Sequence, residues 1–181
     1  LHVVCRRQRQ MCIRDREYPY QEQETINLDL TLSQFGFPLD GIVVKSSPIV
    51  VDLDSDGVKE IYFGSDNEAL HGYNSFGEEI DGFPFQSTDR VRSSPAAGDV
   101  DNDGQMEIVF GNSSGKLYIV NHDGSRELAY TLLGFVESTP ALVDIDGDQD
   151  LEIFFTTTTT SGGHLYGCLL YTSDAADDIP R

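Results

Sequence analysis

Three aspartates at alternate positions, followed by a glycine and a glutamate, are the residues of this sequence best suited to chemistry. The stretch DLDSDGVKEI contains, in this order, Asp52, Asp54, Asp56, Gly57 and Glu60. Carboxylates this close together repel one another unless a cation lies between them. Oxygen ligands without histidine or cysteine favour calcium, magnesium or manganese over zinc or copper. In a loop of this form, alternate side chains point inward around a calcium ion and the glycine permits the tight turn.

The acidic motif recurs at a nearly constant step. The three copies are SSPIVVDLDSDGVKEIYFG (46–64), SSPAAGDVDNDGQMEIVFG (93–111) and STPALVDIDGDQDLEIFFT (138–156). Their first aspartates, Asp52, Asp99 and Asp144, are 47 and 45 residues apart. Repeats of about 40 to 50 residues are typical of propeller blades or of helical arrays.

The local pattern of each repeat favours strands over helices. Segments such as EIYFGS, EIVFGN, KLYIVN and EIFFTT are short, rich in β-branched and aromatic residues, and bounded by Gly, Asn, Asp or Ser. No helical period is sustained, whereas NSFG (74–77) and NHDG (121–124) are typical of hairpin turns. In the first complete copy, strands are predicted at 48–52, 60–65, 69–74 and about 82–86. Four short antiparallel strands form one blade of a β-propeller, and the acidic loop joins the first two.

The predicted fold is therefore all-β: a partial β-propeller of four-stranded antiparallel blades in an open arc. The predicted divisions are the end of a preceding blade (17–45), two blades (46–92 and 93–137) and an incomplete blade (138–167). Since a propeller usually closes with four to eight blades, a segment of this length is not expected to close.

Both ends of the chain lack the repeat pattern. RRQRQMCIRDR within 1–16 and CLLYTSDAAD within 168–181 resemble translations of one transposase-type sequencing adapter read in opposite directions. We interpret both ends as adapter-like artefacts that are not part of the repeat fold. They contain all three cysteines (Cys5, Cys12 and Cys168) and six of the twelve basic residues. No disulfide or cysteine metal site is therefore expected in the repeats.

Composition restricts the possible partners. The 181 residues carry a formal net charge of −19, and 39% of them are hydrophobic, enough for a core. Such acidity argues against nucleic acid as a partner, because nucleic acid attracts Lys and Arg. No apolar run approaches the roughly 20 residues of a membrane span, so no membrane insertion is expected within this segment.

The spacing of the closing glutamate separates these loops from an EF-hand. An EF-hand needs a bidentate Glu at loop position 12 and helices on both sides, whereas here a Phe stands at that position and strands follow. The closing acid stands at position 9 instead. This nine-residue form resembles the FG-GAP/VCBS repeat family, the calcium-binding blades of integrin-α-like propellers that are common in secreted and cell-surface proteins. EIYFG and EIVFG match the Phe-Gly of that family, Ser-Pro stands where its Gly-Ala-Pro falls, and the resemblance covers about 34–167.

The resemblance implies that each loop binds calcium through three Asp side chains, one Glu side chain and one backbone carbonyl. The implied ligands are Asp52, Asp54, Asp56, Glu60 and the carbonyl of Val58; Asp99, Asp101, Asp103, Glu107 and the carbonyl of Gln105; and Asp144, Asp146, Asp148, Glu152 and the carbonyl of Asp150. In the third loop Gln149 replaces the glycine of position 6, so that loop is expected to be distorted or weak. The alternative is that these are ordinary Asx-turns. Three copies in register, each with the distant Glu, argue against it.

The leading interpretation is a non-enzymatic, calcium-binding propeller module of a secreted or cell-surface protein. Such a module would serve adhesion, scaffolding or the binding of a protein or carbohydrate ligand, and extracellular calcium is concentrated enough to fill even weak sites. The alternative is the propeller portion of a secreted enzyme such as a polysaccharide lyase or a peptidase. We see no catalytic constellation, and His71, His122 and His164 are predicted to be surface or turn residues.

Overall fold

The computed structural model describes residues 34–170. The predicted artefact at 1–16, residues 17–33 of the predicted preceding blade end, and residues 171–181 lie outside the described residues. Within the described part every regular element is a strand, so none of its elements is a helix that could span a membrane.

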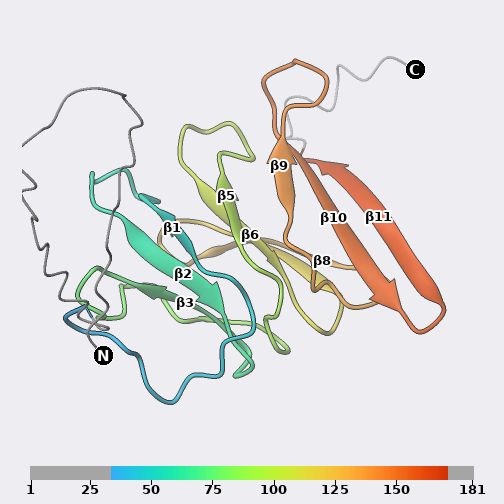
Figure 1. Ribbon diagram of the computed structural model, residues 1–181. Helices are drawn as coiled ribbons and strands as arrows, with labels where there is room; N and C mark the ends of the chain where they lie inside the picture. Colours follow the sequence, from blue (N-terminus) through green and yellow to red (C-terminus); the bar gives the residue numbers. More distant parts are fainter. Residues whose placement is uncertain (1–33, 171–181) are drawn as a thin grey trace, which may run out of the picture. The chain divides into compact units, whose positions relative to one another are not determined.

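The strands form three antiparallel sheets that follow one another along the chain (Figure 1). The first sheet contains β1 (Ile49–Val51), β2 (Glu60–Gly64), β3 (Ala69–Tyr73) and β4 (Phe85–Gln86). The second contains β5 (Ala96–Gly98), β6 (Glu107–Gly111), β7 (Lys116–Val120) and β8 (Arg126–Thr131). The third contains β9 (Ala141–Val143), β10 (Glu152–Thr159) and β11 (Gly162–Leu169). Within each sheet, every strand pairs with the next one in the chain, which confirms the predicted all-β fold of a partial propeller.

Alternation along the strands explains how the sheets pack face to face. In β6, Ile108 and Phe110 join a buried cluster with Tyr62 and Leu70 of the first sheet. The residue between them, Val109, joins a second cluster with residues of the third sheet. Successive side chains of a strand point to opposite faces, so the second sheet has a neighbour on each side. Neither cluster contains residues of both the first and the third sheet, and the arrangement of the described sheets is open.

A stacked aromatic pair recurs on the same face of every sheet. In each pair, a Phe of the second strand stands opposite an aromatic residue of the third strand. The pairs are Phe63–His71 at 5.4 Å, Phe110–Tyr118 at 5.2 Å and Phe155–Tyr166 at 5.4 Å between ring centroids. Phe85 of the first sheet meets both rings of the second pair edge-on. Such contacts add to the burial of apolar area, and those of Phe85 join the first sheet to the second.

Two glycines hold the first and second sheets at close range. Gly82, in the Gly-Phe-Pro stretch before β4, lies against the hairpin turn between β7 and β8, which contains Gly124. A Cβ atom at Gly82 would overlap the carbonyl oxygen of Asp123, and one at Gly124 would overlap that of Gly82. Gly36 and Gly77 make the same kind of contact one repeat earlier. Only residues without a Cβ fit here.

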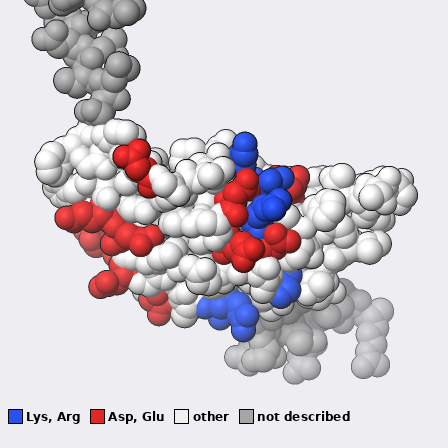
Figure 2. Space-filling model, turned by 90° about the horizontal axis from the view of Figure 1, so that it is seen from below, with Lys and Arg blue, Asp and Glu red and all other residues white. Residues whose placement is uncertain are grey.

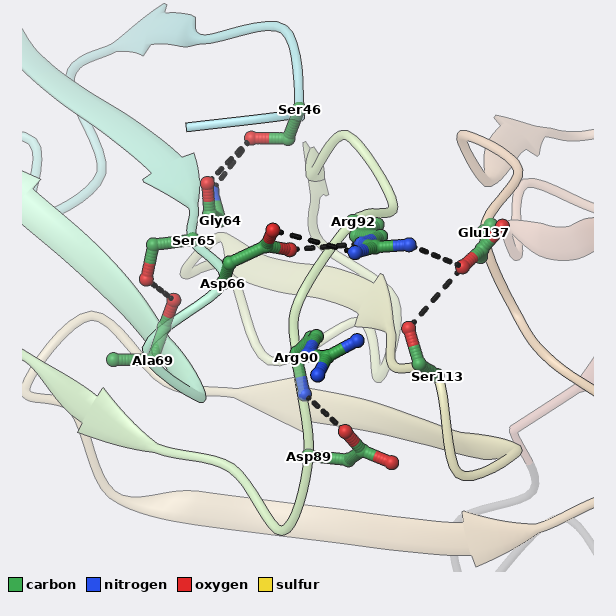
Figure 3. Close-up of polar contacts among 10 residues, drawn as sticks. All are labelled: Ser46, Gly64, Ser65, Asp66, Ala69, Asp89, Arg90, Arg92, Ser113 and Glu137. Atoms are coloured by element: carbon green, nitrogen blue, oxygen red, sulfur yellow. Dashed lines mark hydrogen bonds and ion pairs between the residues drawn. The ribbon is translucent and has the colours of Figure 1, made fainter. Parts of the chain in front are cut away.

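Charged side chains also connect the sheets at the end away from the acidic loops. Arg92, before the second sheet, donates to Asp66 of the β2–β3 turn at 2.7 Å and 3.3 Å, and lies 3.8 Å from Glu137 (Figure 3). The hydrogen bond from Arg92 lowers the pKa of Asp66. Ser113 of the β6–β7 turn donates to Glu137 at 3.2 Å. Seen from below in Figure 2, basic side chains therefore lie among acidic ones.

The third sheet departs from the pattern of the other two. It has three strands among the described residues, and β10 continues through four of the five threonines at 156–160. Its partner β11 extends to Leu169, two residues past the predicted boundary at 167, and Cys168 packs against the second cluster. Ile153 and Phe155 of β10 are buried against the second sheet, whereas Thr156 is exposed.

Candidate metal centres

Strand pairing brings the two ends of each acidic loop together. The loops connect the first two strands of each sheet and lie at the same end of the sheets, the upper end in Figure 1. In each sheet the last residue of the first strand is paired with the closing glutamate: Val51 with Glu60, Gly98 with Glu107, and Val143 with Glu152. The first aspartate of each loop directly follows the last residue of the first strand. The register of the strand pair therefore places this aspartate beside the closing glutamate, eight residues later in the chain. We call these loops the first (52–60), second (99–107) and third (144–152) Asp loops.

The closing glutamates are buried and oriented by the backbone. Glu60, Glu107 and Glu152 are only 7%, 3% and 9% exposed. One carboxylate oxygen of each accepts a hydrogen bond from the amide after the first aspartate, at 3.4 Å, 2.9 Å and 2.8 Å respectively. Because this bond fixes each carboxylate, the side chains are pre-organised rather than free to turn toward solvent.

Three carboxylates converge in every loop. They come from the first aspartate, the second aspartate and the closing glutamate, and each group has one oxygen per residue within 4.8 Å of the others. The groups are Asp52, Asp54 and Glu60; Asp99, Asp101 and Glu107; and Asp144, Asp146 and Glu152. Nine of the twelve predicted side-chain ligands are thus brought together, three in each loop.

The third aspartate of each loop stands outside these groups. The side chains of Asp56, Asp103 and Asp148 each accept a hydrogen bond from the amide two residues later, at 2.7 to 3.0 Å. Their ligand role and that of the carbonyls of Val58, Gln105 and Asp150 stay predictions. The first aspartate also accepts a bond from the amide at position 6 of its loop, at 2.9 to 3.1 Å, which turns the backbone around the carboxylates.

The backbone has a positive φ at the same two positions of all three loops. Position 4 has a positive φ at Ser55 (60°), Asn102 (61°) and Gly147 (87°). Position 6 does so at Gly57 (90°), Gly104 (90°) and Gln149 (82°). The third loop therefore keeps a positive φ at both positions, although it has a glutamine where glycine is favoured. A Cβ at Gly57 or Gly104 would meet nothing within 4 Å, so the cost at Gln149 is conformational rather than a steric clash.

The closing glutamates of the first and second Asp loops resist ionisation in the fold. Burial raises the pKa of Glu107 to about 7, and the nearby carboxylates of Asp101, Glu127 and Asp103 add to the rise, against the hydrogen bond from the Val100 amide. Burial also raises the pKa of Glu60. A positive ion among these oxygens would favour their charged forms.

One buried oxygen atom without a hydrogen-bond partner indicates that the first Asp loop suits such an ion. Oδ1 of Asp52 is buried and has no hydrogen-bond partner, although buried polar atoms are nearly always paired. Its partner oxygen Oδ2 is held by the Gly57 amide. A carboxylate oxygen in this condition, with two more carboxylates beside it, fits a hard divalent cation bound through oxygen.

Sequence reasoning missed two neighbours of the second Asp loop. Glu127 of β8 lies close enough to form a side-chain hydrogen bond with Asp101, which contributes, after burial, to raising the pKa of Glu127. Asn102 donates from Nδ2 to Oδ1 of Asp150 in the third loop at 3.1 Å. Both contacts depend on how separate segments pack, and no spacing in the sequence marks them.

The prediction that His71 is a surface or turn residue is wrong. His71 is 5% exposed, stacks with Phe63 and Tyr73, and lies 3.1 Å from Glu79 and 3.4 Å from Asn67 through its ring nitrogens. It occupies the place that Tyr118 takes in the second sheet. The alignment of LHGYNSFG with LYIVNHDG contained this signal, because it sets His71 opposite Tyr118.

Comparison with known families identifies the repeat. A family model described as FG-GAP-like repeat matches residues 52–110 and, again, residues 99–155. Each match runs from the first aspartate of one Asp loop to the stacked Phe of the next sheet, and together they span more than half of the chain. No curated protein matches the sequence significantly.

Proposed function

The chain belongs to the FG-GAP-like repeat family, and on this premise we propose that it is a calcium-binding β-propeller repeat module. Its role would be to present a rigid surface rather than to catalyse a reaction. The Asp loops would hold calcium ions that fix the first strand of each sheet to the second.

The observation that carries the proposal is the unpaired, buried Oδ1 of Asp52 among converging carboxylates. Calcium accepts six to eight oxygen ligands at 2.3–2.6 Å in flexible geometry, which suits loops whose carboxylates and carbonyls come from alternate residues of one short segment. Magnesium demands a smaller, near-octahedral site and keeps much of its water, so a site made mainly of protein oxygens favours calcium.

We extend the proposal to location and partners. Loops of this kind need calcium near millimolar concentration if their affinity is weak, and that concentration is found outside cells. The module would therefore be part of a secreted or cell-surface protein, engaged in adhesion or scaffolding. Its partner would be a protein or a carbohydrate. The support for this step is the family resemblance and the acidic loops rather than any contact in the molecule.

Calorimetric titration of the chain tests calcium binding directly. We expect at least two calcium sites per chain, with magnesium binding more weakly. Asp52→Asn should abolish or weaken one site, because it removes one charge and alters the orphaned oxygen. Asp40→Asn, an exposed aspartate outside the loops, is the matched control and should leave the titration unchanged. A chain that shows no binding at millimolar calcium would refute the proposal.

A further inference from the structure

We propose that Asn102, in the second Asp loop, is a positioning residue for the ion site of the third Asp loop, so that the two loops bind calcium cooperatively. The inference rests on the proposed function, because it concerns the same loops. The observation behind it is the hydrogen bond from Nδ2 of Asn102 to Oδ1 of Asp150 at 3.1 Å, between residues 48 positions apart.

Asn102 is placed to respond to an ion in its own loop. It lies between Asp101 and Asp103, both of them predicted ligands, and its φ of 61° is a conformation that asparagine tolerates better than most residues. An ion that holds the carboxylates on both sides of Asn102 would also restrict the backbone between them. The amide group that reaches the third loop is then held in one direction.

Asp150 is placed to transmit that restriction to the third loop. Its side chain is not part of the converging carboxylate group, so it is available to bond across to the second loop. Its backbone carbonyl is the predicted ligand of position 7. It directly follows Gln149, whose positive φ of 82° is unfavourable for a residue with a Cβ. A loop with this internal cost depends more on support from outside.

The first and second loops provide a natural contrast. Ser55 stands at the position of Asn102, and Gln105 stands at the position of Asp150. Gln105 donates to Asp103 of its own loop at 3.3 Å, and no hydrogen bond joins the first loop to the second among the described residues. The second and third loops should therefore be coupled, whereas the first should bind independently. Coupling of this kind is reciprocal, so each ion raises the affinity for the other by the same factor.

Each loop contains a glycine amide that can report its own ion. Gly57, Gly104 and Gly147 each donate to the first aspartate of their loop. In a calcium titration of the full chain followed by amide NMR, these three resonances give a separate midpoint for each site. The key variant is Asn102→Gly, since Gly147 already shows that glycine fits position 4. The matched control is Ser55→Gly, the same change in the first loop.

We expect Asn102→Gly to weaken calcium binding at Gly147 by about three- to tenfold, as for the loss of one hydrogen bond of ordinary net strength. The midpoint at Gly57 should stay within twofold. Ser55→Gly should leave the midpoint at Gly104 within twofold. In an Asp150→Ala background, Asn102→Gly should have no further effect on Gly147, which separates positioning from a general loss of stability.

Two outcomes would overturn the inference while calcium binding itself stands. One is an unchanged Gly147 midpoint in Asn102→Gly; the other is an equal loss in the Asp150→Ala background. If none of the three glycine resonances moves at millimolar calcium, the proposed function fails, and this inference fails with it. The two failures are thus distinguishable in a single titration.

Discussion

The strands β6 and β10 have nearly the same sequence but different surroundings. Both begin with Glu-Ile and continue with two apolar residues, in EIVFG and EIFFT. All five residues of β6 are buried, because a sheet packs on each of its faces. In β10 the residues toward the second sheet are buried, but Phe154, at the position of the fully buried Val109, is only half-buried. The neighbours of a blade, rather than its own sequence, determine how much of it is buried.

The largest effect on stability should come from the strand face that is buried in both β6 and β10. Phe110→Ala should lower the free energy of unfolding by about 3–5 kcal/mol, because it removes a fully buried ring between the first and second sheets. Phe154→Ala, on the outer face of the third sheet, should cost about 1 kcal/mol or less. Urea unfolding measures both. Equal losses would show that the third sheet is also covered on its outer face.

The stabilisation that calcium gives should be larger through the second Asp loop than through the third. An occupied loop adds about 2.7 kcal/mol at a calcium concentration one hundred times its Kd. Asp99→Asn should therefore lose most of the stabilisation that calcium gives through the second loop. Asp144→Asn should lose less, because Gln149 weakens the third loop from the start. Thermal unfolding with calcium and with chelator measures the two differences. A larger loss in Asp144→Asn would contradict the ranking.

The pH dependence should be strongest at the second loop. Without calcium, the pKa of Glu107 is about 7 in the fold and about 4.3 in the unfolded chain. The folded state therefore holds this proton more tightly, so its contribution to stability is complete below pH 4.3 and is lost as the pH rises through 7. In chelator, stability should fall by about 2–3 kcal/mol between pH 5 and pH 8, since each pH unit between the two pKa values contributes about 1.4 kcal/mol.

Glu107→Gln should remove most of this dependence, since glutamine does not titrate. Calcium affinity of the wild-type chain should show the opposite trend and weaken below pH 7, because the proton and the ion compete for the same carboxylate. A chain whose stability in chelator is flat from pH 5 to pH 8 would contradict the assignment.

The smallest expected effect concerns the positive φ of position 6. Gln149→Gly should stabilise the chain by about 0.5–1 kcal/mol, because glycine adopts this conformation without strain. Gly57→Gln, the reverse change in the first loop, should destabilise by a similar amount, since its side chain would point into open space. Chemical unfolding in chelator isolates this backbone effect from ion binding. If both substitutions shift the free energy of unfolding in the same direction, the explanation by backbone strain at position 6 is wrong.

Spacing in the sequence predicted most of the fold and the convergent part of the site. The 47- and 45-residue steps located every acidic loop, and alternation located strands such as β2 and β6. The closing glutamates were predictable because ladder register places them beside the first aspartate. The burial of His71 was missed because a polar residue was judged by its type rather than by its position in the repeat.

Contacts between repeats could not be predicted in the same way. The bond from Asn102 to Asp150 joins two loops whose internal patterns are each complete without it. Glu127 approaches Asp101 from a strand that follows a separate hairpin. Neither residue recurs at the equivalent place in the other repeats. A repeat pattern shows what the units share, whereas these contacts depend on what makes one boundary different from the next.

The glycine contact between Gly82 and Gly124 has a consequence for how such an array could lengthen. Each of these residues touches the adjoining unit rather than its own, and the first unit contains both halves: Gly77 faces backward to Gly36, and Gly82 faces forward to Gly124. Duplication of a whole unit would therefore supply matching halves at both new junctions. Duplication of half a unit would set a Cβ against a carbonyl. The smallest inheritable increment of this architecture is thus one complete repeat, whatever loop it carries.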